Sequence, residues 1–203
     1  MDHPIILNYI AKHKQRFLDE LFELLRLPSV SAKPEHQKDM LLTAETIQKR
    51  LLEAGADRVE IAPTEGFPVV YAEKIIDQSK PTVLVYGHYD VQPADPYEFW
   101  ETPPFEPQVR NENIYARGAC DDKGQAMTFI EACRAFKAVT GELPLPITFM
   151  IEGEEECGSA HLFDFVKDNA AELRQDFALI CDTSMWDPKT PRSEEHTSEL
   201  QSP

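Results

Sequence analysis

The chain of 203 residues carries 36 acidic and 20 basic side chains, which give a formal net charge of −16 at pH 7. This charge excludes nucleic acid as an expected partner, because phosphates bind basic surfaces, and the 42% share of hydrophobic residues indicates a packed globular domain rather than disorder. No apolar run is long enough to cross a bilayer, no secretory signal pattern opens the chain, and the four cysteines form no C-x-x-C pair, so we expect no membrane span, reduced thiols and a cytoplasmic location.

The N-terminal part of the sequence predicts two amphipathic helices followed by strands. Apolar residues recur at three- and four-residue steps over residues 4–27, and Pro28 ends this pattern. The same spacing recurs over residues 37–54, where Gly55 supplies a helix stop. Three strand candidates follow, at residues 58–62, 69–76 and 82–86.

Beyond a proline-rich loop at residues 92–106, strands and helices alternate. In chain order we expect a strand at 113–116, a helix that begins after Gly124, a strand at 147–151, a helix at 160–169 and a strand at 177–180. This alternation is typical of an α/β fold with a mainly parallel, mixed sheet flanked by helices on both faces.

Residues 192–203 do not continue this pattern and contain a single apolar residue. Their sequence resembles the translation of a sequencing-adapter oligonucleotide, so we exclude them from fold reasoning as an artefact, and we count no site residue among them. The expected organisation is one domain over residues 1–191 and a tail over residues 192–203.

Charged side chains gather where the predicted strands end. They are His88 and Asp90, Asp121 and Asp122, Glu155 and Glu156, and Asp182. A charge directly after an apolar strand is costly unless it is paired or binds a cation. Because the carboxyl ends of parallel strands meet at one edge of a sheet, we expect these side chains to converge. Two divalent cations would offset the negative charge that such a convergence brings together.

The residue types at these positions suit a metal-dependent hydrolase. Imidazole nitrogen and carboxylate oxygen are ligands for zinc, with manganese and cobalt as alternatives. A carboxylate can bridge two such ions, and a water between them loses a proton near neutral pH. In the Glu155–Glu156 pair, one glutamate can bind metal while the other takes that proton and passes it to a leaving amine. Each motif alone has a plainer interpretation as a solvated loop, a turn or a helix start, so the joint occurrence carries the prediction.

Four motifs resemble those of a known family. They are Gly-His-Tyr-Asp-Val-Gln-Pro at 87–93, Arg-Gly-Ala-Cys-Asp-Asp-Lys-Gly at 117–124, Glu-Gly-Glu-Glu-Glu-Cys-Gly-Ser at 152–159 and Asp-Thr-Ser-Met-Trp at 182–186. In this order and spacing, the chain resembles the two-zinc metallopeptidase family of carnosinase-type dipeptidases, glutamate carboxypeptidases and aminoacylases (peptidase family M-twenty). The resemblance implies a zinc-exopeptidase-like catalytic domain that acts on dipeptides or short peptides with a free C-terminus.

The resemblance also implies a role for each site residue. Asp90 would orient the ring of His88. Glu155 would act as general base and acid, and the peptide bond between Asp121 and Asp122 would be cis. The implied zinc ligands are His88 and Asp182 for one ion, Glu156 for the other, and Asp121 for both.

Similar enzymes are much longer than this chain. They continue beyond the position of Asp182 with an inserted lid or dimerisation domain and return with a second zinc-binding histidine. We therefore expect a truncated catalytic domain, the N-terminal fragment of a dipeptidase that forms a homodimer through the absent domain, with little or no activity of its own. The alternatives are an N-acyl amino acid amidohydrolase, such as an aminoacylase or deacetylase, and a non-catalytic metal-binding protein on the same fold.

Overall fold

In the described part of the chain, six strands form one mixed sheet and two more form a separate hairpin. The computed structural model describes residues 3–77, 79–183, 185–187, 190 and 194–197. The strand order in the sheet is β1-β2-β6-β3-β7-β8. The strands of the sheet are β1 (Arg58–Ala62), β2 (Val69–Lys74), β3 (Val83–His88), β6 (Ile147–Glu152), β7 (Phe177–Ile180) and β8 (Glu194–Thr197), and those of the hairpin are β4 (Gln108–Arg110) and β5 (Asn113–Tyr115).

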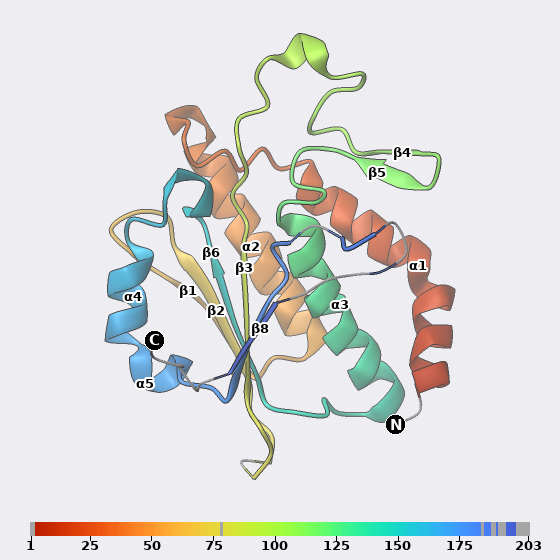
Figure 1. The fold of residues 1–203 in the computed structure, drawn as a ribbon, viewed down its shortest axis with the longest axis vertical. Helices are drawn as coiled ribbons and strands as arrows, with labels where there is room; N and C mark the ends of the chain where they lie inside the picture. The colour runs from red at the N-terminus through yellow and green to blue at the C-terminus, as the bar shows by residue number, and fades with distance from the viewer. Residues whose placement is uncertain (1–2, 78, 184, 188–189, 191–193, 198–203) are drawn as a thin grey trace.

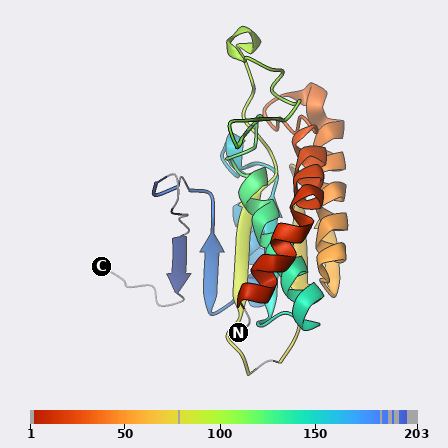
Figure 2. The same ribbon diagram turned by 90° about the vertical axis from the view of Figure 1, so that its right-hand side faces the viewer.

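Helices cover both faces of the sheet. They are α1 (His3–Leu25), α2 (Gln37–Ala54), α3 (Lys123–Thr140), α4 (Leu162–Asp168) and α5 (Ala170–Leu173). Figure 2 shows α1, α2 and α3 gathered on one side of the sheet, and Figure 1 shows α4 and α5 beside its β1–β2 end. Val70 and Ala72 of β2 join the core that α1, α2 and α3 cover. The alternate residues Val69 and Tyr71 pack with Leu173 of α5 on the opposite face. The predicted α/β fold with both faces covered is therefore confirmed.

The centre of the sheet is parallel and its edges are antiparallel. Strands β6, β3 and β7 run in the same direction, whereas β2 pairs with β6, and β8 with β7, in antiparallel fashion. The carboxyl ends of the three central strands therefore face one edge. Strand β3 extends two residues past its predicted end, because His88 pairs in register with Glu152 of β6.

Several predicted boundaries are confirmed at both ends, namely the helix at 37–54 and the strands at 58–62 and 177–180. Gly55 ends α2 in the left-handed region, at φ 101°. The helix predicted at 160–169 is α4, which begins two residues later, at Leu162, and ends at Asp168; the short α5, which follows after Asn169, was not predicted.

The strand predicted at 113–116 is β5, whereas β4 and the turn that joins the two strands were missed. Asn111 and Glu112 have φ values of 50° and 65°, which a two-residue turn between twisted strands requires. Glutamate at positive φ is uncommon, so this pair gives no recognisable turn signal.

Part of the segment that the sequence sets apart lies against the sheet. Residues 194–197 form β8, which pairs with β7 in a register that places Phe177 opposite Thr197. We expected this segment to lie outside the fold, but residues 194–197 form a strand of the sheet. Residues 192–193 and 198–203 lie outside the described ones. An extended segment of any sequence can add main-chain hydrogen bonds to an open strand edge, so the division of the chain after residue 191 stays a prediction.

A buried lysine ties the start of α3 to the end of α1. Lys123 is fully buried, and its Nζ donates hydrogen bonds to the carbonyl oxygens of Leu24, at 3.2 Å, and Leu27, at 2.7 Å. Each carbonyl also accepts one main-chain N–H, that of Leu24 from Leu27 at 3.2 Å and that of Leu27 from Ser29 at 2.9 Å, so the lysine supplies a second donor to both. Burial lowers the pKa of Lys123 to about 7. The contact fixes the backbone next to the Asp121–Asp122 peptide bond, which is cis as expected.

We expect Lys123→Met to lower the free energy of unfolding by about 1–3 kcal/mol at pH 10, because two buried hydrogen bonds to main-chain carbonyl groups are lost. In the folded protein the lowered pKa makes the amine lose its proton at a lower pH than in the unfolded chain. The stability of the unsubstituted protein therefore falls as the pH is lowered from about 10 towards about 7, and the difference between the two proteins shrinks over this window. Urea unfolding of both proteins across this pH range measures the difference between their free energies of unfolding. Lys14→Met, at an exposed position of α1, is the control; parallel pH curves for Lys123→Met and the unsubstituted protein would contradict the prediction.

Candidate metal centre

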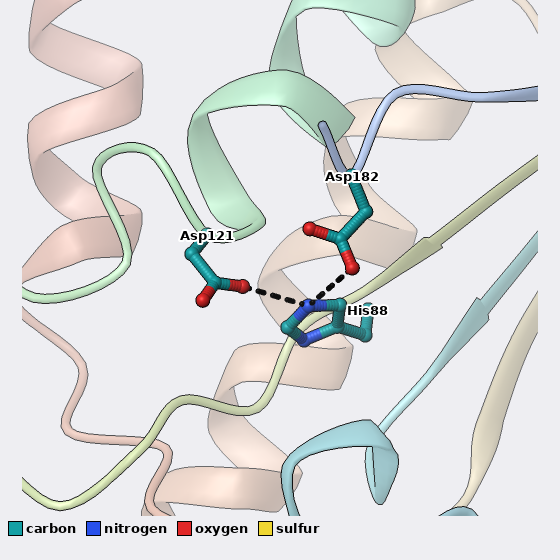
Figure 3. Close-up of side chains that lie close together, drawn as sticks. All are labelled: His88, Asp121 and Asp182. Carbon is teal, nitrogen blue, oxygen red and sulfur yellow. Dashed lines mark hydrogen bonds and ion pairs between the residues drawn. The ribbon is translucent and has the colours of Figure 1, made fainter. Parts of the chain in front are cut away.

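Three of the predicted metal ligands meet at the carboxyl edge of the sheet. His88 is the last residue of β3, Asp182 follows β7, and Asp121 lies just before α3. Figure 3 shows both carboxylates turned towards one nitrogen of the imidazole. His88 Nε2 lies 3.1 Å from Asp121 Oδ1 and 3.7 Å from Asp182 Oδ2. The prediction that side chains from distant parts of the chain converge is therefore confirmed for these three.

The donor atoms of this cluster fit a metal ion. One ligand atom from each of His88, Asp121 and Asp182 lies within 4.8 Å of the others. Nitrogen and carboxylate oxygen donors in such a group suit zinc and related divalent ions. The imidazole has no solvent exposure, whereas Asp121 is 49% exposed, so the cluster is anchored in the core and opens to solvent on its acidic side.

The electrostatics of His88 reflect the surrounding carboxylates. Burial lowers the pKa of its ring, but the hydrogen bond and charge of Asp90, with the charges of Asp122 and Glu155, outweigh burial and raise the pKa to about 10. A proton and a metal ion both neutralise repulsion among these carboxylates, and both use the Nε2 lone pair, so they compete for the same place.

Asp122 lies behind the cluster and is itself buried. Its Oδ2 accepts the main-chain N–H of His88 at 3.1 Å, while its Oδ1 has no hydrogen-bond partner among the described residues. Burial raises the pKa of this carboxyl to about 7, against the opposing charge of His88. Asp122 thus supports the backbone at His88 and does not join the three clustered ligands.

Asp90 connects His88 to the loop that carries the two glutamates. Its Oδ1 lies 3.3 Å from His88 Nδ1, on the side of the ring away from the cluster. The same carboxylate accepts hydrogen bonds from Ser31 Oγ at 2.6 Å and from the main-chain N–H groups of Glu155 and Glu156 at 3.2 and 3.0 Å. This position suits the predicted orienting role, since a carboxylate behind a ligand imidazole fixes its ring and tautomer. Sequence reasoning missed Ser31, which lies 59 residues before Asp90 and carries no local signal.

Glu155 lies at the edge of the cluster and is partly exposed to solvent. Its Oε2 is 3.9 Å from His88 Nε2, and its side chain is 36% exposed. Partial burial raises the pKa of this carboxyl, with the positive charge of His88 acting in the opposite direction. A carboxylate beside a metal cluster, with a raised pKa, is placed to accept and return a proton.

Glu156 is held differently from the other predicted ligands. None of its atoms belongs to the group of ligand atoms within 4.8 Å of one another. Its carboxylate accepts hydrogen bonds from Gln92, from the side-chain Nε2 to Oε2 at 2.7 Å and from the main-chain N–H to Oε1 at 3.2 Å. Gln92 lies inside the motif at 87–93, but sequence reasoning gave it no role.

A hollow of about 760 Å³ lies beside the cluster and includes Asp121 and Asp182 in its wall. Apolar side chains such as Leu21, Ile114 and Met185 form much of the remaining lining. Its volume falls within the range of small-molecule sites, which combine apolar walls with a few polar groups.

The sheet and the cluster together define a class, the zinc-exopeptidase-like α/β domains, in which metal ligands follow the carboxyl ends of parallel strands. Within it, the chain belongs to the family described as Peptidase family M20/M25/M40, which matches residues 84–195. The matched segment contains all four predicted ligands, Asp90 and Glu155. The resemblance stated from the motifs is therefore confirmed.

Relatives with known activities match nearly the whole chain. It is similar to Beta-Ala-His dipeptidase of Homo sapiens, with 36% identity over 89% of this chain and 38% of that protein, and to Cys-Gly metallodipeptidase DUG1 of Saccharomyces cerevisiae, with 31% identity over 89% of this chain and 41% of that protein. The crystal structure of human carnosine dipeptidase 1 matches at 33% identity with a TM-score of 0.82, over 89% of this chain and 41% of that one. The chain thus spans about two fifths of the length of these relatives.

None of the helices in the described residues combines the length and the hydropathy that a bilayer crossing demands.

Proposed function

We propose that the protein hydrolyses the peptide bond of dipeptides or short peptides with a free C-terminus, using two zinc ions. The observation that carries the proposal is the cluster of His88, Asp121 and Asp182 with Glu155 at its edge. A general base beside metal ligands has no use in a module that only binds metal, so this residue argues against the non-catalytic alternative.

Each group in the centre has one proposed task. His88 and Asp182 would hold one ion, Glu156 would hold the other, and Asp121 would be a ligand of both. When bound, zinc polarises a scissile carbonyl and acidifies a water molecule. Manganese or cobalt would suit the same nitrogen and oxygen donors.

The proton transfers fall to Glu155. Its carboxylate accepts a proton from the attacking water and donates it to the nitrogen of the departing amine, so the base returns to its starting state after one turnover. Asp90 contributes by position. It contacts the ring of His88 and also accepts the main-chain N–H of Glu155, which keeps the base and a metal ligand at a fixed separation.

The names of the relatives support peptides, rather than N-acyl amino acids, as the substrates. Two similar proteins are named for dipeptides, β-alanyl-histidine and cysteinyl-glycine, whereas an aminoacylase would share the metal centre and differ in substrate. We expect the full-length gene product to cleave both dipeptides with added zinc and to lose this activity on treatment with a chelator. Amine release from the two dipeptides and from N-acetyl amino acids is the measurement. Cleavage of the acetylated compounds alone would overturn the choice of substrate.

Location and assembly complete the proposal. The proposed location is the cytoplasm, as expected from the wide spacing of the four cysteines in the sequence. The partner is a small peptide rather than nucleic acid or a membrane, and the homodimer expected from the resemblance would form outside the segment described here.

A further inference from the structure

Gln92 holds Glu156 at three points. Its side-chain Nε2 donates to Glu156 Oε2 at 2.7 Å and to the main-chain carbonyl oxygen of Glu156 at 3.1 Å. Its main-chain N–H donates to Glu156 Oε1 at 3.2 Å. Both carboxylate oxygens and the carbonyl of one residue are therefore bonded to one partner, 64 positions earlier in the chain.

The backbone around Gln92 is fixed by other contacts. Val91 is buried, and its N–H donates to the carbonyl of Ser29 at 2.9 Å. Asp90, on the other side of Val91, accepts the N–H of Glu156 at 3.0 Å. Residues 90–92 therefore hydrogen-bond to the main-chain N–H, the main-chain carbonyl and the side-chain carboxylate of Glu156.

This arrangement orders the carboxylate while leaving it able to bind a cation. A glutamate side chain loses rotamer entropy when it is fixed in one orientation, and here the hydrogen bonds fix it before a metal ion binds. The donors are neutral amides, so they do not cancel the negative charge as a lysine or arginine would. A carboxylate has about four lone-pair sites, and Gln92 uses one on each oxygen, which leaves acceptor capacity for a metal.

We propose that Gln92 is a positioning residue that pre-orients Glu156 for the second metal ion. The inference rests on the proposed function, in which Glu156 is a ligand of that ion. Partners that hydrogen-bond to metal ligands typically contribute 10- to 100-fold to metal affinity, and a residue that contacts Glu156 alone should affect one of the two sites.

Zinc titration of the metal-free full-length gene product tests this inference, with Gln92→Met as the variant, since this chain spans about two fifths of its relatives' length. Methionine has a similar length and no donor, so it removes the side-chain hydrogen bonds and keeps the packing. We expect about a 10- to 100-fold weaker second zinc site, with the affinity of the first site and the melting temperature of the metal-free protein unchanged. Gln92→Ala, which lacks the bulk of methionine, is expected to give the same selective loss. Competition with a chromophoric chelator measures both affinities.

Two further variants separate the possible failures. Gln15→Met removes a similar bond, from Gln15 Nε2 to Asp19 Oδ1 at 2.9 Å on α1, and should leave both sites unchanged. Glu156→Gln should remove the second site. If Glu156→Gln removes it and both Gln92 variants match the unsubstituted protein, the role of Gln92 is wrong and the ligand assignment stands. If Glu156→Gln changes nothing, or the unsubstituted full-length gene product binds a single ion, the ligand assignment itself is wrong, and the inference falls with it.

Discussion

Replacing Asp121 with alanine is expected to abolish binding of the second zinc ion and to weaken the first by more than about 100-fold, more than the loss of a supporting residue costs. Asp121 is the proposed ligand of both ions, and its Oδ1 lies 3.1 Å from the Nε2 of His88. Without Asp121, each proposed zinc site loses one of its carboxylate ligands. Calorimetric zinc titration of the metal-free full-length gene product measures the effect.

The control for Asp121→Ala must make the same change in net charge. Asp164→Ala does so at an exposed position of α4, and we expect it to bind zinc as the unsubstituted protein does. Two zinc ions bound by Asp121→Ala with unchanged affinities would show that Asp121 is not a ligand of either ion and that the group in Figure 3 is not the metal centre.

Replacing Glu155 with glutamine is expected to lower kcat for dipeptide hydrolysis by about 10²- to 10⁴-fold, the usual contribution of a general base. The amide keeps the shape of the side chain but cannot accept and return a proton. Because Glu155 is not a proposed ligand, zinc stoichiometry should stay the same. The measurement pairs steady-state kinetics of the full-length gene product with its metal content.

The matched control for Glu155→Gln is Glu45→Gln, an exposed residue of α2, which should leave kcat unchanged. Loss of zinc from Glu155→Gln would assign the residue to metal binding instead of proton transfer. A rate equal to that of the unsubstituted enzyme would exclude Glu155 as the base.

Local pattern was sufficient for the elements that place the cluster. The apolar run before Gly87 and the alternation of strands with helices predicted a buried strand and a parallel sheet centre. From that topology alone, His88 and Asp182 had to lie at one edge, since β3 and β7 run parallel. The convergence was therefore predictable without any knowledge of side-chain geometry.

The details that sequence reasoning missed depend on contacts between distant segments. Ser31 reaches Asp90 from a loop far away in the chain, and Gln92 reaches Glu156 in the same way. Period and spacing describe neighbours within one element, so they do not show which donor of another loop approaches a carboxylate. Lys123 is a further example, because a lysine after two aspartates indicates a solvated turn, whereas the structure buries it against the end of α1.

Anomalous diffraction at the zinc edge, from crystals of the zinc-loaded protein, tests the central claim most directly. The account predicts two peaks about 3.5–4 Å apart, the first in contact with His88 Nε2 and Asp182, the second in contact with Glu156, and Asp121 touching both. A map with no peak at His88, or with a single peak that Asp121 does not touch, would contradict it.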